Sequence, residues 1–220
     1  MPVLYGAYRS RATRNIWLAE EIGLDLELRR VWQAYRLDQP EAAGAPMNTR
    51  SPEFLALSPM GAIPVLVDGD LVLSESLAIN LYLARRHGGD LGPRDEEENA
   101  RMVQWALFGA TAIEAPALAI QTVHNEGLED TDRGRQEIAD HVERLHRPLR
   151  ALDAHLGTRQ WMVGGRFTVA DINMAEILRY AQGEPGLLAA HPAVDGWLRS
   201  CQERPGFRRM WARREAEPVR

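Results

Sequence analysis

The pattern of apolar and polar residues over the first fifty positions predicts a strand, a helix and a second strand, followed by a loop. Val3 to Gly6 is a short apolar run typical of a strand. Ala12 to Ile22 carries apolar residues at helical spacing, and Gly23 follows where a helix commonly ends. Positions 24 to 28 place leucine at every second residue, the period of a half-buried strand. Residues 35 to 51 have no period and contain proline and glycine, so we expect a mobile loop there.

The stretch from Ser58 to Arg86 contains the clearest pattern in the chain. The apolar run Ile63 to Val67 precedes the dipeptide Asp68-Gly69, and the apolar run Leu71 to Leu73 follows it. Aspartate followed by glycine readily adopts the positive φ angles of a two-residue turn, so this stretch predicts a β-hairpin centred on that dipeptide.

A helix is expected directly after the hairpin. Ser74 occupies the position of an N-cap, so the helix should begin at about Glu75. Leu77, Leu81 and Ala84 recur at spacings of four and three, which predicts that they form its apolar face.

The pattern divides the chain into two domains and a linker. Residues 1 to 86 read as strand, helix, strand, loop or short helix, strand, strand, helix, the order of an α/β sandwich with a mixed four-stranded sheet. Residues 87 to 98 are rich in glycine and charge and make a natural linker. Residues 99 to 220 are helical in pattern throughout, which predicts an all-helical bundle domain.

Two long helices dominate the expected helical domain. The first carries Met102, Trp105, Phe108 and Ile113, and Pro116 should kink it. The second has an apolar stripe that Pro148 should interrupt; its members are Ile138, Val142, Leu145, Leu149, Leu152 and Leu156. Further helices are expected over residues 168 to 180, 192 to 204 and 207 to 214.

The segment FTVADI predicts a helix start. Thr168 and Asp171 stand three residues apart, the spacing of a capping box, and Phe167 and Ile172 flank them as a hydrophobic staple. We therefore assign Asp171 a structural role rather than a catalytic one.

Composition limits the possible partners. Among 220 residues, 45% are hydrophobic and 26% charged, as in a soluble globular protein. The net charge of −5 argues against nucleic acid or an acidic membrane surface as a partner. We find no window approaching a membrane span and no signal peptide, so a cytoplasmic location is expected. Cys201 is the only cysteine and the histidines are scattered, so neither a disulfide framework nor a metal site is predicted.

The helix expected after the hairpin offers a specific binding chemistry. Unpaired N–H groups and partial positive charge at its N-terminus attract a carboxylate, and the Ser76 hydroxyl adds a donor. The Glu75 carboxylate attracts an ammonium group. A ligand with both groups on one carbon would satisfy this site, although acids and hydroxyls are also common in first turns without any binding role.

These residues resemble those of the glutathione transferase family, in which a proline opens a strand and an acid and a serine start the next helix. Pro64, Glu75 and Ser76 carry the resemblance, and FTVADI and HPAVDGWLRSCQERPGF extend it over nearly the whole chain. It implies a thioredoxin-like first domain, a cis bond before Pro64, and glutathione as co-substrate. The γ-glutamyl end should lie at Glu75 and Ser76, the cysteinyl part at the backbone of Ile63, and the glycyl carboxylate at Arg50 if that arginine is not simply a surface residue.

The group that activates the thiol stays open between several hydroxyls. Ser10 in the pattern YRSRATR resembles the catalytic serine of theta-like and zeta-like bacterial members, and it precedes a helix whose dipole favours a thiolate. Tyr5 is the rival, because other classes use a tyrosine at the end of the first strand. Tyr8, Thr13 and backbone donors alone are further candidates. Ser10 could also serve only as a helix cap.

The predicted function is conjugation of glutathione to a small electrophile, or reduction of a hydroperoxide, by a cytoplasmic homodimer. Trp105 and Phe108 are candidates for the acceptor-substrate site, with plain core packing as the alternative. A non-catalytic glutathione-transferase-like binding protein and a glutathione-dependent isomerase or dehalogenase are the alternative functions.

Overall fold

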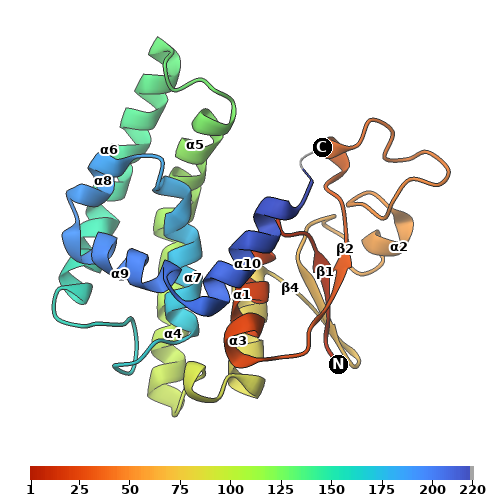
Figure 1. Ribbon diagram of the computed structural model, residues 1–220, viewed down its shortest axis with the longest axis horizontal. Helices are drawn as coiled ribbons and strands as arrows, with labels where there is room; N and C mark the ends of the chain where they lie inside the picture. The colour runs from red at the N-terminus through yellow and green to blue at the C-terminus, as the bar shows by residue number, and fades with distance from the viewer. Residues whose placement is uncertain (219–220) are drawn as a thin grey trace. The chain divides into compact units, whose positions relative to one another are not determined.

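The computed structural model describes residues 1–218, which form two compact units (Figure 1). The first unit comprises residues 1–89 together with 205–218, and the second comprises residues 90–204. The first unit contains a four-stranded sheet and the second is helical. This confirms the predicted fold class, a mixed α/β domain followed by a helical one.

The sheet has the strand order β2-β1-β3-β4. Strand β1 (Val3–Gly6) pairs in parallel with β2 (Glu27–Arg30) and antiparallel with β3 (Val65–Asp68), which pairs antiparallel with β4 (Leu71–Ser74). Strand β2 begins later than the leucine alternation at positions 24 to 28 predicted. Leu24 and Leu26 precede the strand and are only half-buried. They continue the alternation of leucine with polar residues but lie outside the strand that pairs with β1.

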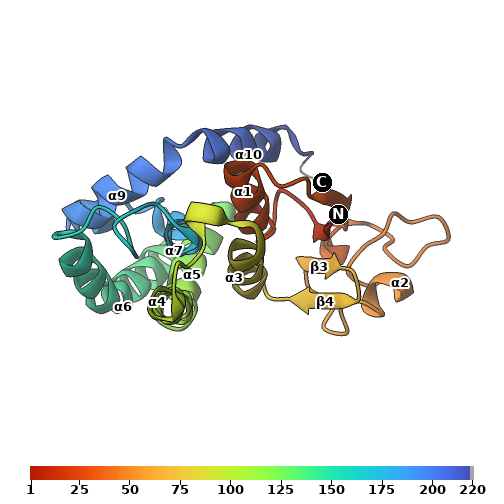
Figure 2. The same ribbon diagram turned by 90° about the horizontal axis from the view of Figure 1, so that it is seen from below.

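Two helices lie along one face of the sheet and a short helix lies on the other (Figure 2). The first face carries α1 (Thr13–Ile22) and α3 (Ser76–His87). The second carries α2 (Pro52–Leu55), whose Phe54 joins Tyr5, Val31 and Val65 in an apolar cluster. A 3₁₀ turn, η1 (Ala34–Arg36), opens the long loop before α2.

The hairpin is confirmed, but its turn is displaced by one residue. Asp68 pairs with Leu71, so the two loop residues are Gly69 and Asp70 rather than Asp68 and Gly69. Only the first of them has a positive φ, at 61° for Gly69. Glycine at the first loop position is the arrangement of a type II′ turn, which matches the twist of the flanking strands.

Helix α3 also differs from its expected form. Ser74 is the last residue of β4, Glu75 is the N-cap, and the helix begins at Ser76. The buried face is formed by Ser76, Ile79, Asn80, Leu83 and Ala84, whereas Leu77 and Leu81 are half-buried. Asn80 on this face is buried because it belongs to a polar network, described below. A prediction from the spacing of apolar residues could not identify this face as the buried one.

The last helix belongs with the first unit. Helix α10 (Pro205–Ala216) runs beside α1, and the ring of Phe207 meets that of Trp17 edge-on at 5.0 Å between centroids (Figures 1 and 2). The predicted division had placed this helix in a domain of residues 99 to 220, because a helical pattern does not reveal which neighbour a helix packs against. The boundary between units falls at Gly89 and Asp90, inside the predicted linker.

The first long helix of the second unit breaks before Pro116. Helix α4 (Glu96–Phe108) passes into a π-helical turn, η3 (Gly109–Ile113), and then into α5 (Glu114–Asn125). Proline lacks an N–H for the carbonyl four residues earlier and its ring clashes with that carbonyl, so the distortion falls upstream of the proline. Gly109 allows a close approach there, since a Cβ on it would lie 2.7 Å from Cδ1 of Ile177.

The segment from α4 through α5 also corrects the expectation about membrane-length segments. Residues Glu96–Asn125 are long and apolar enough to cross a membrane by length and composition. The buried side chains of α5 include Ala117, Ile120 and Val123, and this helix packs against α6 (Asp132–Leu156) and α7 (Val169–Leu178). About a third of the apolar window is buried, so one face of this segment packs inside the helical unit.

Helix α6 runs through Pro148 without a break, contrary to the predicted interruption. Most members of the predicted stripe are buried on it, and Pro148 is buried among them. After α7 the unit is completed by η4 (Arg179–Ala181), α8 (Pro185–Ala189) and α9 (Pro192–Gln202); a short 3₁₀ turn, η2 (Gly89–Leu91), precedes α4.

The capping box at the start of α7 is confirmed. The Asp171 carboxylate accepts hydrogen bonds from the N–H of Thr168 at 2.9 Å, the N–H of Met162 at 3.0 Å and Nε1 of Trp197 at 2.9 Å. Burial raises its pKa to about 6, against the opposing pull of these donors. The carboxylate joins three segments of the helical unit, as its structural assignment predicted.

Candidate functional site

The strand register brings three predicted site segments to one end of the sheet. Tyr5 on β1 pairs with Val65 on β3, and Val65 pairs with Ser74 on β4. The chain therefore leaves β1, enters β3 after Pro64 and leaves β4 before Glu75 at the same end. Ser10, Pro64 and the Glu75-Ser76 turn consequently face a common region of the first unit.

Gly6 makes this convergence possible. A Cβ on Gly6 would lie 2.8 Å from the Cβ of Ala12 and 3.7 Å from the Cβ of Pro64. The absence of a side chain thus lets the loop between β1 and α1 fold back against both neighbours. Sequence patterns do not indicate this role, because one of the two contacts comes from Pro64, far along the chain.

The Ser10 side chain lies in the loop before α1 and is half-buried. Its hydroxyl donates to the carbonyl of Ala7 at 2.7 Å, and its Oγ accepts from the N–H of Ala12 at 3.1 Å. Helix α1 begins at Thr13, with Ala12 as its N-cap and no capping side chain. Ser10 is therefore not the helix cap, although its oxygen is held by an N–H at the start of that helix.

The competing hydroxyls have other surroundings. The Tyr5 ring is packed in the apolar cluster on the sheet, and its OH accepts a hydrogen bond from Nη1 of Arg29 at 2.9 Å. Thr13 is buried and its Oγ1 donates to the carbonyl of Ser10 at 3.1 Å. Of the four candidate hydroxyls, Ser10 combines partial exposure with a helix N–H on its oxygen.

Glu75 has an unusual backbone conformation. Its φ of 70° and ψ of 108° make it the one residue other than glycine with positive φ among the described residues. Such a conformation costs on the order of 1–3 kcal/mol and persists where surrounding structure or function requires it. The side chain is exposed, so its carboxylate can reach a ligand at the start of α3.

Ser76 is tied to α1 by a buried polar network. Nη1 of Arg14 donates to its Oγ at 3.0 Å, and Nδ2 of Asn15 donates to its carbonyl at 2.8 Å. Asn15 also donates to Oδ1 of Asn80 at 2.7 Å, and Nδ2 of Asn80 donates to the carbonyl of Arg14 at 3.1 Å. Sequence reasoning missed Arg14, Asn15 and Asn80. Their occurrence on helix faces expected to be buried could have indicated a buried polar network.

The remaining predicted residues of the first unit have different settings. The Ile63-Pro64 bond is cis, as the family resemblance implied. Arg50 has an exposed side chain whose Nη1 lies 3.5 Å from Oε1 of Glu41 in the loop before α2. This is the exposed setting of a surface arginine, and its assignment to the glycyl carboxylate stays a prediction.

Trp105 and Phe108 lie on α4 in the second unit and are half-buried. Their rings meet edge-on with 5.4 Å between centroids, and Trp105 also packs against the ring of His155 at 4.6 Å. Burial lowers the pKa of His155 from its ordinary value. The three rings form a partly open aromatic cluster on the helical unit.

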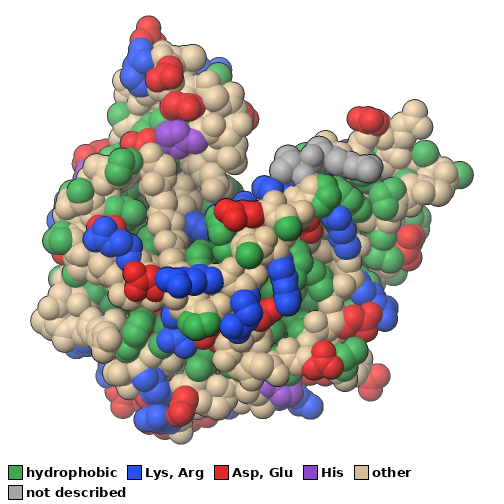
Figure 3. All heavy atoms as spheres, in the orientation of Figure 1, with side chains coloured by type: hydrophobic (Ala, Val, Ile, Leu, Met, Phe, Trp, Pro, Cys, Tyr) green, Lys and Arg blue, Asp and Glu red, His purple; other side chains and the backbone are tan. Residues whose placement is uncertain are grey.

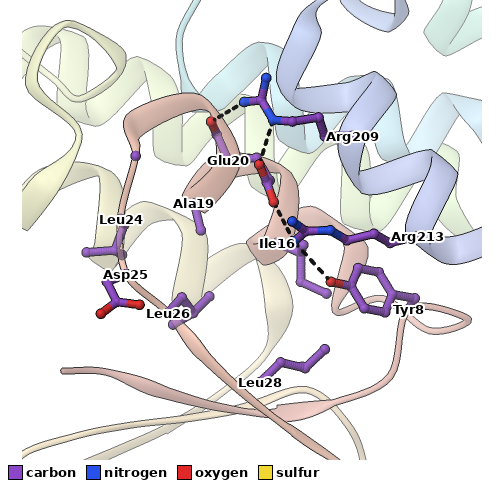
Figure 4. Close-up of a pocket in the computed structure, with 11 residues that line it drawn as sticks. Tyr8, Ile16, Ala19, Glu20, Leu24, Asp25, Leu26, Leu28, Arg209 and Arg213 are labelled. Carbon is purple, nitrogen blue, oxygen red and sulfur yellow. Dashed lines mark hydrogen bonds and ion pairs between the residues drawn. The ribbon is translucent and has the colours of Figure 1, made fainter.

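A cavity of about 360 Å³ lies elsewhere on the first unit, between α1, β2 and α10 (Figure 4). Three of its charged side chains are paired with one another: the Glu20 carboxylate accepts from Nε of Arg209 and from Nη1 of Arg213, each at 2.7 Å. Its apolar lining comes from Ile16, Ala19, Leu24, Leu26 and Leu28. None of Ser10, Glu75 or Ser76 lines it, so this cavity is separate from the candidate site.

Comparison with known proteins gives consistent matches to both halves of the chain. Residues 4–93 match the family described as "Glutathione S-transferase, N-terminal domain", and residues 103–205 match "Glutathione S-transferase, C-terminal domain". Glutathione S-transferase 3 of Zea mays is 34% identical over 171 residues, covering 74% of this chain and 76% of the relative.

Solved structures agree with these matches. Glutathione transferase F7 from Populus trichocarpa is similar with a TM-score of 0.79 and 27% identity, covering 96% of this chain and 98% of that one. A glutathione transferase family member from Pseudomonas fluorescens with two glutathione bound has a TM-score of 0.77 and 28% identity, covering 95% and 91%.

Proposed function

The chain belongs to the glutathione S-transferase family, and we propose that it activates the glutathione thiol with the Ser10 hydroxyl. Transferase activity toward glutathione follows from the family. The observation that carries the assignment of Ser10 is the hydrogen bond from the N–H of Ala12 to its Oγ. That N–H fixes the oxygen and leaves the hydroxyl proton to be donated.

The proposed chemistry needs one donor to sulfur. A free thiol is mostly protonated at neutral pH, whereas the thiolate is the nucleophile. In this mechanism the Ser10 O–H turns from the carbonyl of Ala7 to the sulfur, so it exchanges a neutral hydrogen bond for a charge-assisted one. The thiol proton passes to solvent. The thiolate then forms a carbon–sulfur bond with an electrophile, whose leaving group departs with the electron pair. With a hydroperoxide, the thiolate attacks the terminal oxygen and the O–O bond breaks, so that an alkoxide leaves and takes up a proton. A second glutathione then reacts with the resulting sulfenic acid to give the disulfide and water.

The γ-glutamyl end of glutathione is assigned to Glu75, Ser76 and Arg14. Ser76 accepts a hydrogen bond from the buried guanidinium of Arg14, and its hydroxyl proton remains to be donated to a carboxylate. Arg14 adds positive charge to that of the α3 N-terminus. The exposed Glu75 carboxylate supplies the counter-charge for the ammonium group.

The cysteinyl part of glutathione and the acceptor substrate are assigned to two further regions. We propose that the backbone at Ile63 and Pro64 pairs with the cysteinyl part of glutathione, since it lies at the same end of the sheet as Ser10. Trp105 and Phe108 are proposed for the acceptor substrate because their partly open aromatic surface would take an apolar electrophile. The serine-type class is likewise proposed on Ser10. The plant relatives do not single out a theta-like or zeta-like bacterial class.

We also propose that the protein is a homodimer. Large apolar side chains are exposed in the first unit at Met60 (88%), Val72 (45%) and Leu71 (38%). In the second unit, Leu107 on α4 is 59% exposed. A second copy of the chain would bury these side chains through a two-fold interface.

The test of Ser10 separates chemistry from binding. Ser10→Ala deletes a donor to the thiolate, worth about 1.5–3 kcal/mol, so turnover should fall roughly 10-fold to 150-fold while glutathione affinity changes little. The thiol pKa of bound glutathione, followed by the ultraviolet absorbance of the thiolate, should rise.

Tyr5→Phe is the matched control, because it keeps the packed ring and removes only the hydroxyl that accepts from Arg29. A raised thiol pKa in Tyr5→Phe with an unchanged value in Ser10→Ala would transfer the role to Tyr5.

A further inference from the structure

The segment that follows α10 places a carboxylate on the loop that carries Ser10. Oε1 of Glu217 accepts a hydrogen bond from the N–H of Tyr8 at 3.1 Å, and Oε2 accepts from the N–H of Arg9 at 2.7 Å. The Glu217 side chain is only 8% exposed, so these bonds are shielded from water. Charge-assisted bonds of this kind are among the stronger ones in proteins.

Arg9 is held at several further points. Its Nε donates to the carbonyl of Glu217 at 2.9 Å, and its Nη2 donates to the carbonyl of Glu215 at 3.2 Å. Nε2 of Gln33 donates to the carbonyl of Arg9 at 3.0 Å. Both backbone polar groups of the residue preceding Ser10 are thus bonded to side chains from distant parts of the chain.

Helix α10 fixes the position of Glu217. Its Arg209 and Arg213 both pair with Glu20 on α1 (Figure 4). Met210 on the same helix is fully buried. The basic side chains of α10 contribute to the blue groups on the face of the molecule drawn in Figure 3. Because α10 packs along α1, the segment that follows α10 lies close to the loop at the N-terminus of α1.

The loop needs such an anchor. Strand β1 ends at Gly6 and α1 begins at Thr13, so the backbone between them belongs to no strand or helix. Its N–H groups must find partners outside regular structure, and those of Tyr8 and Arg9 find one carboxylate.

From this arrangement we propose that Glu217 is a positioning residue that holds Tyr8 and Arg9, and thereby sets the place of the Ser10 hydroxyl. The inference rests on the proposed role of Ser10. It assigns to the segment after α10 a part in catalysis without contact with the substrate. A displacement of about 1 Å at a catalytic donor can cost on the order of 100-fold in rate, so loosening this loop should be visible in turnover.

The test compares Glu217→Ala with Glu215→Ala in the full-length protein. Glu215 is the matched control: it is a nearby carboxylate, it accepts a hydrogen bond from Nε1 of Trp211 within α10, and its contact with Arg9 uses only the backbone. We expect amide hydrogen exchange at Tyr8 and Arg9 to accelerate at least about 10-fold in Glu217→Ala and to be unchanged in Glu215→Ala.

Activity with glutathione and a standard aryl halide gives the second readout. Turnover of Glu217→Ala should fall about 10-fold with the KM for glutathione changed less than about 3-fold, and the thiol pKa of bound glutathione should rise. Glu217→Gln keeps one carbonyl acceptor but turns an NH2 group toward the other N–H, so it should restore the turnover only in part. A general loss of folding would instead lower the melting temperature and affect KM and turnover alike.

Three results would overturn the proposal. Unchanged exchange at Tyr8 and Arg9 would show that the carboxylate does not hold the loop. Faster exchange with unchanged turnover and thiol pKa would show that the hold has no catalytic effect. Increased turnover would show that the segment obstructs the site. If Ser10→Ala leaves the wild-type thiol pKa unchanged, the proposed function fails instead, and the exchange experiment still reports on Glu217.

Discussion

Nη1 of Arg14 donates a 3.0 Å hydrogen bond to Oγ of Ser76, and both side chains are buried. The bond joins the first turn of α1 to the first turn of α3. It places a guanidinium behind the hydroxyl proposed to bind the γ-glutamyl carboxylate. Arg14 would thus act on the ligand indirectly, through Ser76. The motif around Pro64 does not include Arg14 and does not indicate this contact.

Replacing Arg14 should therefore weaken glutathione binding through Ser76. Arg14→Met removes the charge, and we expect the dissociation constant to rise roughly 10-fold to 150-fold, the equivalent of about 1.5–3 kcal/mol. Ser76→Ala should have a similar effect, and the double variant should lose less than the sum of the two. Calorimetric titrations of the four proteins measure this; strictly additive losses would mean that Arg14 acts independently of Ser76.

Two substitutions of Glu75 should weaken glutathione binding equally but differ in their effect on stability. Glu75→Ala and Glu75→Gly both remove the carboxylate proposed for the ammonium group, so each should weaken glutathione binding by about 1.5–3 kcal/mol. At a φ of 70°, however, alanine keeps the backbone strain and glycine relieves it. Urea unfolding should find Glu75→Gly more stable than Glu75→Ala by about 1 kcal/mol. Equal affinities for wild type and both variants would remove Glu75 from the site.

The ion pair of Glu98 and Arg166 should make the stability of the helical unit depend on acid pH. The Arg166 guanidinium donates to both carboxylate oxygens at 2.7 Å and lowers the pKa of Glu98 to about 2 from an ordinary 4.5. A lowered folded-state pKa stabilises the fold above about pH 4.5, and this contribution is lost as the pH falls from 4.5 to 2. The pKa difference corresponds to about 3 kcal/mol.

Glu98→Gln should accordingly be less stable than wild type by about 2–3 kcal/mol at pH 7, with the difference shrinking toward pH 2.5. Glu97→Gln is the matched control, because Glu97 pairs with Arg101 on the exposed side of the same helix and should matter by less than about 0.5 kcal/mol. Urea unfolding at several pH values measures both. A pH-independent difference for Glu98→Gln would contradict the assignment.

Asp171 contributes with the opposite sign and must be considered in that experiment. Its folded-state pKa is raised to about 6, so its buried charge lowers stability above that value and the loss is relieved as the pH falls from 6 to 4. Comparing variant with wild type at each pH cancels this contribution, since Asp171 is present in both.

The proposed dimer should depend on Met60. Met60→Glu places a charge in the two-fold interface and should shift the sedimentation mass from twice the chain mass of 24.7 kDa toward the chain mass itself at micromolar concentration. Leu128→Glu, at an exposed leucine between α5 and α6, is the control and should leave the mass unchanged. A wild-type mass near 24.7 kDa would contradict the proposal outright.

Local chemistry let the sequence by itself determine several parts of this protein. Gly23 ends α1 with a φ of 65°, the capping box of Thr168 and Asp171 starts α7, and the hairpin before α3 forms. Each depends on residues a few positions apart, so backbone propensity and short-range hydrogen bonds suffice. The residues Pro64, Glu75 and Ser76 are identified instead by the resemblance to the glutathione transferase family, which the sequence shows because the motif is continuous in the chain.

Tertiary structure alone decided which faces and partners these elements have. Asn80 rather than Leu77 or Leu81 is buried on α3, because Asn15 from α1 satisfies its amide. Glu217 reaches Tyr8 across 209 positions of sequence. Such bonds exist only after packing brings distant backbone groups together and shields them from water. Neither periodicity nor spacing in the sequence records which donor an acceptor will meet.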